Sequence, residues 1–455
     1  MGGLIIPGVQ VSVVKEVLPQ QLAPSGILGI VGFTEKVPDA GVERASNWNR
    51  LKDVFGAGTA LSLPEARQAL DNGVSQLVIA PLAQGAGARS TIKVPQAEDG
   101  KGDAFTLTAR AAGVWSNDVK VQLRRRDAGA GKSVLDVKIL RPDGSELEGH
   151  RGLVIDATSD RDLAKVLARS AVVGVSAVAG WPKDGDYTLK DGADATPEQY
   201  AEALKLLAGE PDVDMVIAAV QDVSAARKTD TIKIYSDVIA HCESLSRESK
   251  GRIGFGQVSA SISTADHVEM AGYLVSDRFV LVAPHGVVGA VAGMVGSLPY
   301  FHSPTFKTLA GLGVVKAIGV DAQKELLTAN VVPVVNERGK GVVVLRGLTT
   351  DGDQINVRRV ADRAVRTMKM IGDLFIGRLN TADGRNALKQ KLIESLLQMD
   401  KDGAIVPSTD GKDPSFKVDV YSSQADFALG IVRVDMAVRP VRAIDYIYAT
   451  ILVQV

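Results

Sequence analysis

The sequence predicts a multidomain protein of the mixed α/β class, with an α/β core, an inserted β-rich domain and a strand arm at each end. Three patterns support this prediction. Apolar strand-like runs alternate with helices in two separate parts of the chain, which is typical of parallel strands joined by right-handed crossovers. Short alternating strands, separated by Gly, Asp and Pro turns, lie between those parts. Apolar residues also recur at every second position near both ends of the chain.

The composition excludes several classes of protein. The 455 residues are too many for one hydrophobic core, so several domains are expected. A hydrophobic content of 45 % and a charged content of 23 % are ordinary for a folded soluble protein. The net charge of −1 gives no reason to expect a nucleic acid or an acidic membrane as partner. With a single cysteine, Cys242, no internal disulfide can form, and the first ten residues lack the pattern of a secretion signal, so cytosolic synthesis is expected.

The first 90 residues contain a predicted arm and the start of the core. Residues 1–24 form the N-terminal arm, in which Val9, Val11 and Val13 occupy alternate positions, and Pro24 ends a short linker. Residues 25–90 are the first part of the α/β core. Its expected elements are a strand at 27–33, helices at 48–55 and 64–72, and a strand at 77–80.

Residues 91–194 are predicted to form the inserted β-rich outer domain. Turn sequences such as Pro142-Asp143-Gly144 divide this part into short alternating segments. The expected elements are strands at 105–110, 119–125, 134–140 and 153–156, then a helix near 160–170 and a glycine-rich stretch at 180–194.

The α/β pattern resumes in residues 195–330, and residues 331–439 are expected to form a C-terminal core domain. Thr196-Pro197-Glu198 is a typical helix start. The run 279–298 is apolar enough to suggest a membrane span, but Pro284 and His285 interrupt it. A buried strand that leads into a Gly/Ala-rich helix is therefore the preferred interpretation. The other expected strands lie at 213–220, 253–258, 341–346 and 416–421, and the helices at 196–207, 229–246, 264–275, 356–377 and 383–399.

The chain ends in two alternating stretches that meet at Pro440. Val432, Val434, Met436 and Val438 predict a strand with one buried face, which Pro440 ends because proline cannot continue the ladder. Residues 440–455 form the predicted C-terminal arm, whose alternate apolar residues are Ile447, Ala449, Ile451, Val453 and Val455. Unpaired strand edges are a liability unless another strand covers them. We therefore expect other copies of this chain to pair with both arms.

Two groups suggest an enzyme, and neither forms a convincing site. Residues 129–133 resemble the end of a phosphate-binding loop, but Arg126 stands where that motif needs glycine, and the loop leads into a strand. A hairpin loop is preferred, with a nucleotide site at Lys132 as the alternative. His241 and Cys242 are neighbours on a predicted helix, so their side chains point about 100° apart. The preferred interpretation is that Cys242 packs in the core. The alternative is a cytosolic α/β hydrolase with Cys242 as its nucleophile. The histidines lack zinc-ligand spacing, so we expect no metal, no cofactor and no catalytic residue.

Basic residues recur at helical spacing in the C-terminal third. One predicted helix carries Arg358, Arg359, Arg363, Arg366 and Lys369, and the next carries Arg385, Lys389 and Lys391. Most such runs are solvated helix faces. The alternative is a docking surface for an acidic protein partner.

A series of short motifs resembles the contractile tail sheath family of phages, tailocins and related injection systems. Each motif is weak, and their order along nearly the whole chain carries the resemblance. The Trp115 turn departs from the family pattern at Ala112 and Ser116, and the acid expected near the C-terminus is shifted to Asp445. The matching stretches are 7–11, 55–56, 66–78, 112–117, 189–218, 284–293, 330–346, 355–359 and 416–455.

The resemblance implies a structural role. It implies that the arms of each subunit add strands to the sheets of neighbouring subunits, and that subunits form stacked rings, with six per ring expected, around an inner tube. Contraction would drive the tube through a target envelope without nucleotide hydrolysis. The implied partners are further copies of the chain, the tube, baseplate and tail terminator proteins, with no nucleic acid and no membrane insertion. The implied location is a phage tail or injection particle assembled in the bacterial cytoplasm.

The resemblance also suggests where the moving and docking parts lie. The arm linkers at Pro24 and Pro440 are candidate hinges, because each joins an arm to the body. The candidate residues for contact with the tube are Arg358, Arg359, Arg385, Lys389 and Lys391.

Overall fold

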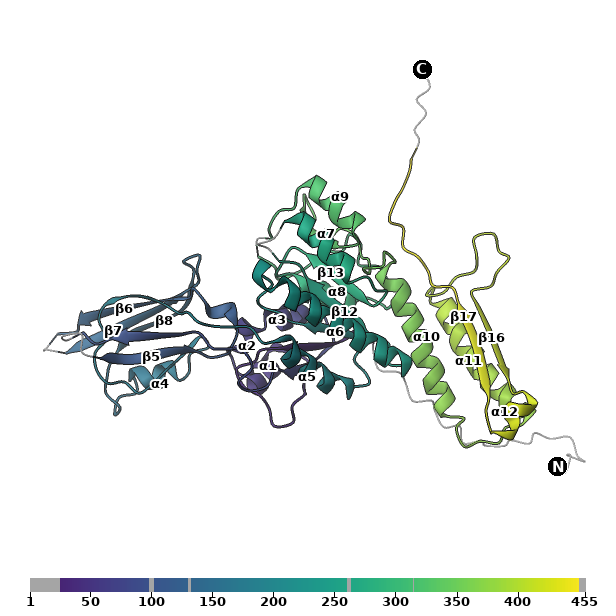
Figure 1. Cartoon of the computed structure of the whole chain (residues 1–455), viewed down its shortest axis with the longest axis horizontal. Coiled ribbons are helices and arrows are strands. Elements are labelled where there is room, and N and C mark those ends of the chain that lie inside the picture. Colours follow the sequence, from purple (N-terminus) through teal and green to yellow (C-terminus); the bar gives the residue numbers. More distant parts are fainter. Residues whose placement is uncertain (1–24, 98–101, 130–131, 260–262, 314, 450–455) are drawn as a thin grey trace, which may run out of the picture.

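An eight-stranded sheet forms the centre of the computed structural model, which describes residues 25–97, 102–129, 132–259, 263–313 and 315–449 (Figure 1). Strands β1 to β14 of this sheet pair in parallel, apart from β2, and β2 and β15 are antiparallel at the two edges. The parallel pairing predicted from the sequence is therefore confirmed. Across the sheet the strands are β15 (Gly341–Val344), β14 (Val332–Glu337), β13 (Phe279–Ala283), β12 (Ile253–Gln257), β11 (Met215–Ala218), β1 (Ile27–Gly32), β3 (Gln76–Pro81) and β2 (Glu43–Ala45).

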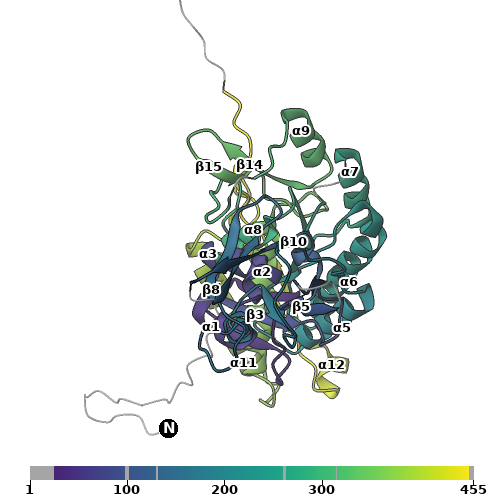
Figure 2. The same ribbon diagram turned by 90° about the vertical axis from the view of Figure 1, so that its left-hand side faces the viewer.

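Helices cover both faces of the sheet, as Figure 2 shows for α3 on one side and α6 on the other. Alternate residues of β1 point to opposite faces, so Leu28 and Ile30 pack in one core while Ile27 and Val31 pack in the other. One face carries α1 (Trp48–Phe55), α3 (Pro64–Asp71) and α8 (Val288–Ser297). The short α2 (Thr59–Ser62), between α1 and α3 in the chain, packs its Leu61 against a separate core. The other carries α5 (Pro197–Ala208), α6 (Lys228–Arg247), α7 (Thr264–Tyr273) and α9 (Val320–Thr328), with a short 3₁₀ turn at Ala225–Arg227 before α6.

Helix α8 explains the apolar run that resembled a membrane span. Nine of its residues, Val288 to Gly296, are buried. Gly289 and Gly293 lie directly against the backbone of α3, where a Cβ would collide with Glu65 and Ala69. The small residues therefore allow two helices to pack closely, and the predicted buried strand and Gly/Ala-rich helix are confirmed. None of the described helices is both long and apolar enough to cross a membrane.

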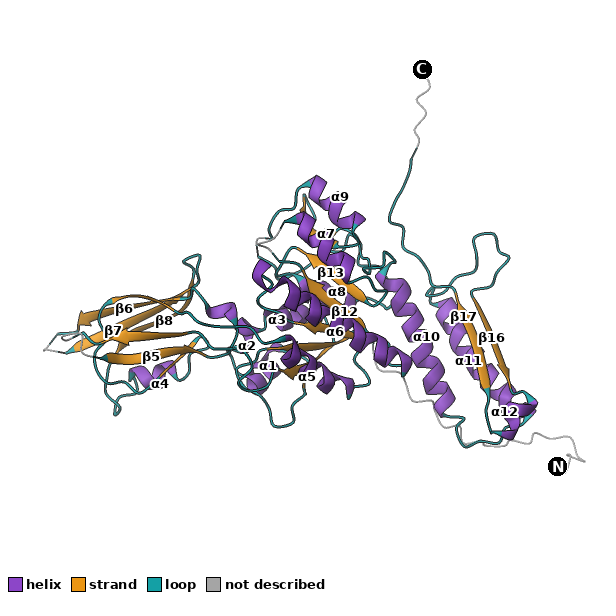
Figure 3. Cartoon of the chain, in the orientation of Figure 1, coloured by secondary structure: helices purple, strands orange, loops and turns teal. Residues whose placement is uncertain are grey.

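Strands β4 to β10 form two small sheets at one end of the molecule, around a hydrophobic core of their own (Figure 3). We call this part the outer domain. Its sheets have the orders β10-β6-β7-β8 and β4-β5-β9. The elements are β4 (Thr91–Pro95), β5 (Asp103–Ala109), a 3₁₀ turn (Val114–Ser116), β6 (Lys120–Asp127), β7 (Ser133–Leu140), β8 (Glu146–Leu153), α4 (Leu163–Leu167), β9 (Val173–Val175) and β10 (Gly185–Thr188).

The turn around Trp115 joins the outer domain to the central sheet. Gly113 has a φ of +108°, and a Cβ there would collide with the Gln221 side chain. Gln221 accepts a hydrogen bond from the Trp115 N–H (3.2 Å) and donates one to the Ser62 carbonyl (2.7 Å). The motif that suggested a sheath protein is thus a contact point between two parts of the fold.

Two long helices and a two-stranded ribbon form the C-terminal part, at the opposite end from the outer domain (Figure 1). The ribbon, β16 and β17, packs its inward side chains against the helices, which gives the alternating burial that the sequence predicted. The elements are α10 (Ile355–Asp373), α11 (Ala382–Lys401), β16 (Phe416–Tyr421), α12 (Gln424–Ala428) and β17 (Arg433–Val438).

Most predicted elements are confirmed, with local differences. The strand expected at 153–156 lies earlier, at β8, because the Asp143-Gly144 turn reverses the chain at once into a hairpin with β7. Strand β14 was not predicted, although its six residues lie within a stretch that resembles the sheath family. The residue limits suggested for the separate domains stay predictions.

Candidate assembly interface

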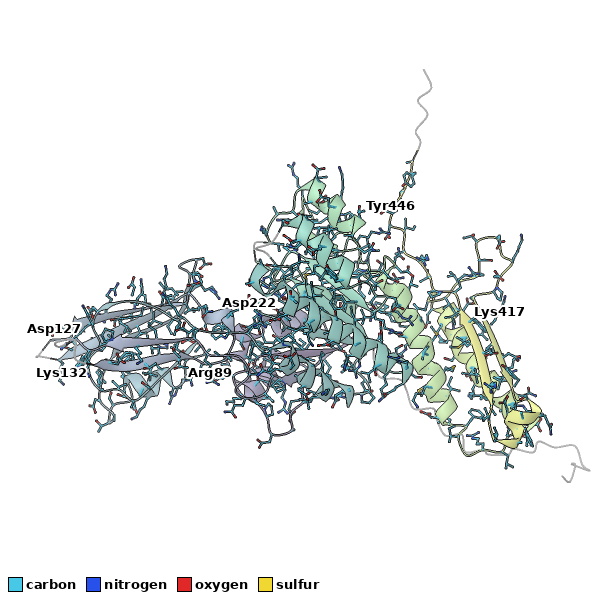
Figure 4. All side chains as sticks on the ribbon, in the orientation of Figure 1. Arg89, Asp127, Lys132, Asp222, Lys417 and Tyr446 are labelled. Carbon is cyan, nitrogen blue, oxygen red and sulfur yellow. The ribbon has the colours of Figure 1, made fainter. Side chains whose placement is uncertain are left out.

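The β16–β17 ribbon leaves one long edge of each strand unpaired within the described residues. Its register runs from Phe416 opposite Val438 to Tyr421 opposite Arg433. The outward face is polar and exposed, as Lys417 illustrates in Figure 4. Added strands would satisfy the free backbone groups on both edges. The ribbon is therefore a candidate for strand addition.

Several predicted arm residues lie outside the described residues: Val9, Val11, Val13, Pro24, Ile451, Val453 and Val455. Ile447 and Ala449 are described, and they do not lie in a strand. Ile447 is 84 % exposed and Tyr448 is 95 % exposed. Residues 447–449 have no ladder partner among the described residues, so the described part of the predicted strand is unpaired in this subunit.

Pro440 does not lie in a free linker. It pairs in an antiparallel bridge with Ile405, and the next residue, Val441, donates its N–H to the Ala404 carbonyl at 3.0 Å. Backbone hydrogen bonds thus hold this segment on the body of the subunit in this structure, and the hinge at Pro440 stays a prediction.

Of the two candidate tube-contacting arginines on α10, Arg359 is buried and Arg358 is half-buried. Arg359 is 6 % exposed and donates to the carbonyl of Val295 at 2.7 Å. Arg358 pairs with Asp277 and Asp362, at 2.9 Å each. Both side chains hold α10 on the central sheet, and Arg359 is too buried to contact a partner from this position. The sequence placed the basic residues on one helix correctly, but only the packing of that helix reveals which way each points.

The basic residues of α11 remain nearer the surface. Lys389 pairs with Asp419 of β16 at 3.0 Å, and Lys391 pairs with Glu394 at 3.0 Å. Arg385 donates to the Asn380 side-chain oxygen at 2.7 Å. Lys389 thus also links α11 to the ribbon. These three residues stay candidates for contact with a partner.

The buried interior contains ion pairs and carboxyl groups that sequence reasoning did not single out. Arg278, beside β13, makes two hydrogen bonds of 3.0 Å to Asp362 of α10, and both side chains are at most 10 % exposed. Asp194 accepts the N–H groups of Gln221 and Asp222 at 2.8 Å. Glu65 is 7 % exposed, and its burial raises its pKa to about 7. Helical periodicity predicted none of these contacts, because each joins segments far apart in sequence.

Cys242 and His241 do not form a nucleophile and base. The thiol is fully buried, and burial raises its pKa to about 12, so it is not a thiolate at neutral pH. His241 faces Arg252 at 2.9 Å, and burial lowers the pKa of the imidazole to about 4. The predicted packed cysteine is confirmed.

The loop at Lys132 joins β6 and β7 at the far end of the outer domain (Figure 4). Ala128 and Lys132 close it through a backbone hydrogen bond of 2.8 Å. No helix follows whose N-terminus could bind a phosphate, so the predicted hairpin is confirmed. Within the described residues, no three His, Cys, Asp or Glu side chains gather as metal ligands would.

Comparison with known proteins rests on structure. No family model and no curated protein sequence matches this chain. Several solved structures match over almost their full lengths, and three of them illustrate the result. The contracted helical sheath of the anti-feeding prophage is 14 % identical, with 98 % of this chain and 99 % of that chain covered and a TM-score of 0.58.

Two further matches are of the same kind. The contracted sheath complex of PVC, an extracellular contractile injection system, is 12 % identical, with coverages of 99 % and 98 % and a TM-score of 0.57. A sheath tail protein from Listeria innocua is 16 % identical, with coverages of 93 % and 93 % and a TM-score of 0.53. The chain therefore has the fold of the contractile tail sheath proteins over nearly its whole length.

Proposed function

We propose that this protein is the structural subunit of a contractile tail sheath. The observation that carries the proposal is the match of 98 % of the chain to a sheath protein in its helical assembly. A match of this extent includes the outer domain, the central sheet and the C-terminal helices together. The proposed role is mechanical, with no catalytic step assigned to any residue.

Assembly is proposed to occur by exchange of the two arms. Residues 1–24 and 447–455 would each add a strand to a neighbouring subunit, and the open edges of the ribbon are the proposed acceptors. Contacts of this head-to-tail kind build helical filaments when their rotation does not close, and we propose stacked rings of six. The exposed apolar side chains of Ile447 and Tyr448 support this role for the C-terminal arm.

Contraction is proposed to release energy stored during assembly. The subunits would form first in a metastable extended sheath and then rearrange, over a barrier, to a more compact one. Such a rearrangement needs no nucleotide. It would drive an inner tube through the envelope of a target cell, in a phage tail or injection particle assembled in the bacterial cytoplasm.

The proposed partners are the inner tube, the baseplate and the tail terminator. For the tube we retain three basic residues of α11 as contacts, because they lie near the surface: Arg385, Lys389 and Lys391. Arg358 is a weaker candidate, since it already pairs with two acids. We assign no part in nucleic acid binding or membrane insertion to any residue.

Electron microscopy of the purified protein tests the proposal. Striated tubes are expected from the full chain, and a folded subunit without long polymers is expected when residues 447–455 are deleted. Normal tubes from the shortened chain would refute arm exchange. A full-length protein that stays monomeric, even with its tube protein, would count against the sheath function itself.

A further inference from the structure

The segment before the exposed residues 447–449 is held on the core by side chains that form hydrogen bonds as a neighbouring strand would. We call residues 440–446 the strap and residues 447–455 the tail. Gln354, at the start of α10, accepts the N–H of Ala443 at 2.8 Å and donates to its carbonyl at 3.0 Å. Asn356 donates to the carbonyl of Val441 at 3.0 Å. In an antiparallel β-ladder, the N–H and the carbonyl of one residue form hydrogen bonds with the same neighbour. Ala443 has this pattern with the Gln354 side chain.

Asp445 ties the end of the strap to three parts of the body. Its Oδ2 atom accepts hydrogen bonds from Arg346 Nε and Gln354 Nε2, at 2.8 Å each. Its Oδ1 lies 3.5 Å from the Thr305 hydroxyl. The carboxylate side chain is 7 % exposed, whereas most surface ion pairs are solvated. We call these contacts the Asp445 clamp.

Contact with the core ends abruptly after the clamp. Tyr446 still lies over the Arg346 guanidinium, 5.2 Å from it, and is 62 % exposed. Ile447 and Tyr448 are 84 % and 95 % exposed. Figure 4 shows Tyr446 on the chain where it leaves the core. Among the described residues, the contacts with the core therefore stop between Asp445 and Ile447.

We infer that Asp445, held by Arg346 and Gln354, is a positioning residue for the C-terminal arm, and that the arm pivots at Tyr446–Ile447 and not at Pro440. This inference rests on the proposed sheath function. Arg346 follows β15 and Gln354 precedes α10, so a pull on the tail would load the central sheet directly. It would bypass the β16–β17 ribbon, which precedes the strap in sequence. A fixed root also limits the directions the tail can take, which lowers the entropy lost when a neighbour binds it.

The position of the pivot sets how far the tail can swing. At about 3.3 Å per extended residue, Tyr448 lies about 7 Å from a pivot at Tyr446 and about 26 Å from one at Pro440. Spin labels are attached through Tyr448→Cys and Lys417→Cys, and the distance between the two labels is measured. The width of its distribution reports how far the tail swings. Both sites are exposed, and the buried Cys242 is shielded from the label.

Two variants open the clamp by different routes, and a third serves as the matched control. Asp445→Asn removes the charge that pairs with Arg346, and Gln354→Leu removes the amide that holds Ala443. In the control, Asp373→Asn breaks an exposed ion pair with Lys369 at the end of α10 opposite to Gln354. Thermal unfolding identifies any variant that fails to fold, and two independent clamp variants keep the test decisive.

The expected result is a distribution that widens several-fold in both clamp variants and stays narrow in the control. Electron microscopy of the same proteins should find at least tenfold fewer long polymers for the clamp variants. Unchanged widths would overturn the clamp, and widened distributions with normal polymers would overturn its part in assembly. A wild-type protein with a narrow distribution but no polymers would instead refute the proposed function, while the distances would still support the clamp.

Discussion

Replacing Glu65 with glutamine should remove one contribution to the pH dependence of the free energy of unfolding. Glu65 lies in the first turn of α3, where its backbone packs against Gly289 of α8. Its Oε1 atom is 3.5 Å from the Gln257 amide nitrogen, and the nearby acid Asp194 adds to the cost of a negative charge. Burial is the main reason that the pKa rises from 4.5 to about 7.

The sign of the effect follows from the raised pKa. The folded protein binds the Glu65 proton more tightly than the unfolded chain, so protonation stabilises the folded state. This contribution is fully present below pH 4.5 and is lost as the pH rises through about 7. Because one pKa unit corresponds to about 1.4 kcal/mol, the loss amounts to about 3 kcal/mol. Glutamine has nearly the same shape and no proton to lose, so the Glu65→Gln variant should keep that stability at pH 8.

The assay is urea unfolding of both proteins between pH 4.5 and 8, on chains without residues 447–455 so that polymers do not interfere. We expect equal stabilities near pH 4.5 and a variant more stable by up to about 3 kcal/mol at pH 8. Glu202→Gln is the control, because the Glu202 side chain is 71 % exposed and should give no such difference. A difference between Glu65→Gln and wild type that does not change with pH would refute the reasoning.

Three further predictions concern the ion pairs and the proposed function. Asp362→Ala leaves the buried Arg278 without its ion-pair partner, so the free energy of unfolding should fall by about 3 to 5 kcal/mol. Asp277→Ala at the surface should change the free energy of unfolding by less than about 1 kcal/mol. Equal losses of stability for the two variants in urea unfolding would contradict this prediction. On α11, reversing the charges of Arg385, Lys389 and Lys391 should weaken co-sedimentation with the tube protein. Unchanged binding would remove this surface from the proposal. Lys132→Ala and Cys242→Ala should each leave polymers and contraction intact by electron microscopy. A large loss of either property in one of these variants would favour an enzyme.

Local sequence was sufficient for most elements and for the class of fold. Helix α5 begins where Thr196 and Pro197 predicted, because the Thr196 side chain caps the helix and Gln199 completes the capping box. The buried strands and the packed α8 followed from apolar runs and small residues. The order of weak motifs pointed to the sheath proteins, and structural comparison confirmed the fold.

The roles of individual polar residues could not be predicted in the same way. Asp445 attracted attention only as an acid displaced from its expected position, and its partners Arg346 and Gln354 lie 99 and 91 residues away in sequence. Arg359 resembled the other basic residues of its helix until packing placed it against the Val295 carbonyl. Such contacts depend on how distant segments meet, which local periodicity does not describe.

The sequence by itself predicted most of the strands and helices, although not β14, and showed that apolar residues alternate near both ends of the chain. That information is local, since helix and strand periods are properties of neighbouring residues. Only the tertiary structure decided where the C-terminal arm becomes free, because Gln354 and Asp445 come together through folding and not through spacing. It placed the fixed root of the arm at Asp445, beyond the proline at which the sequence suggested a hinge.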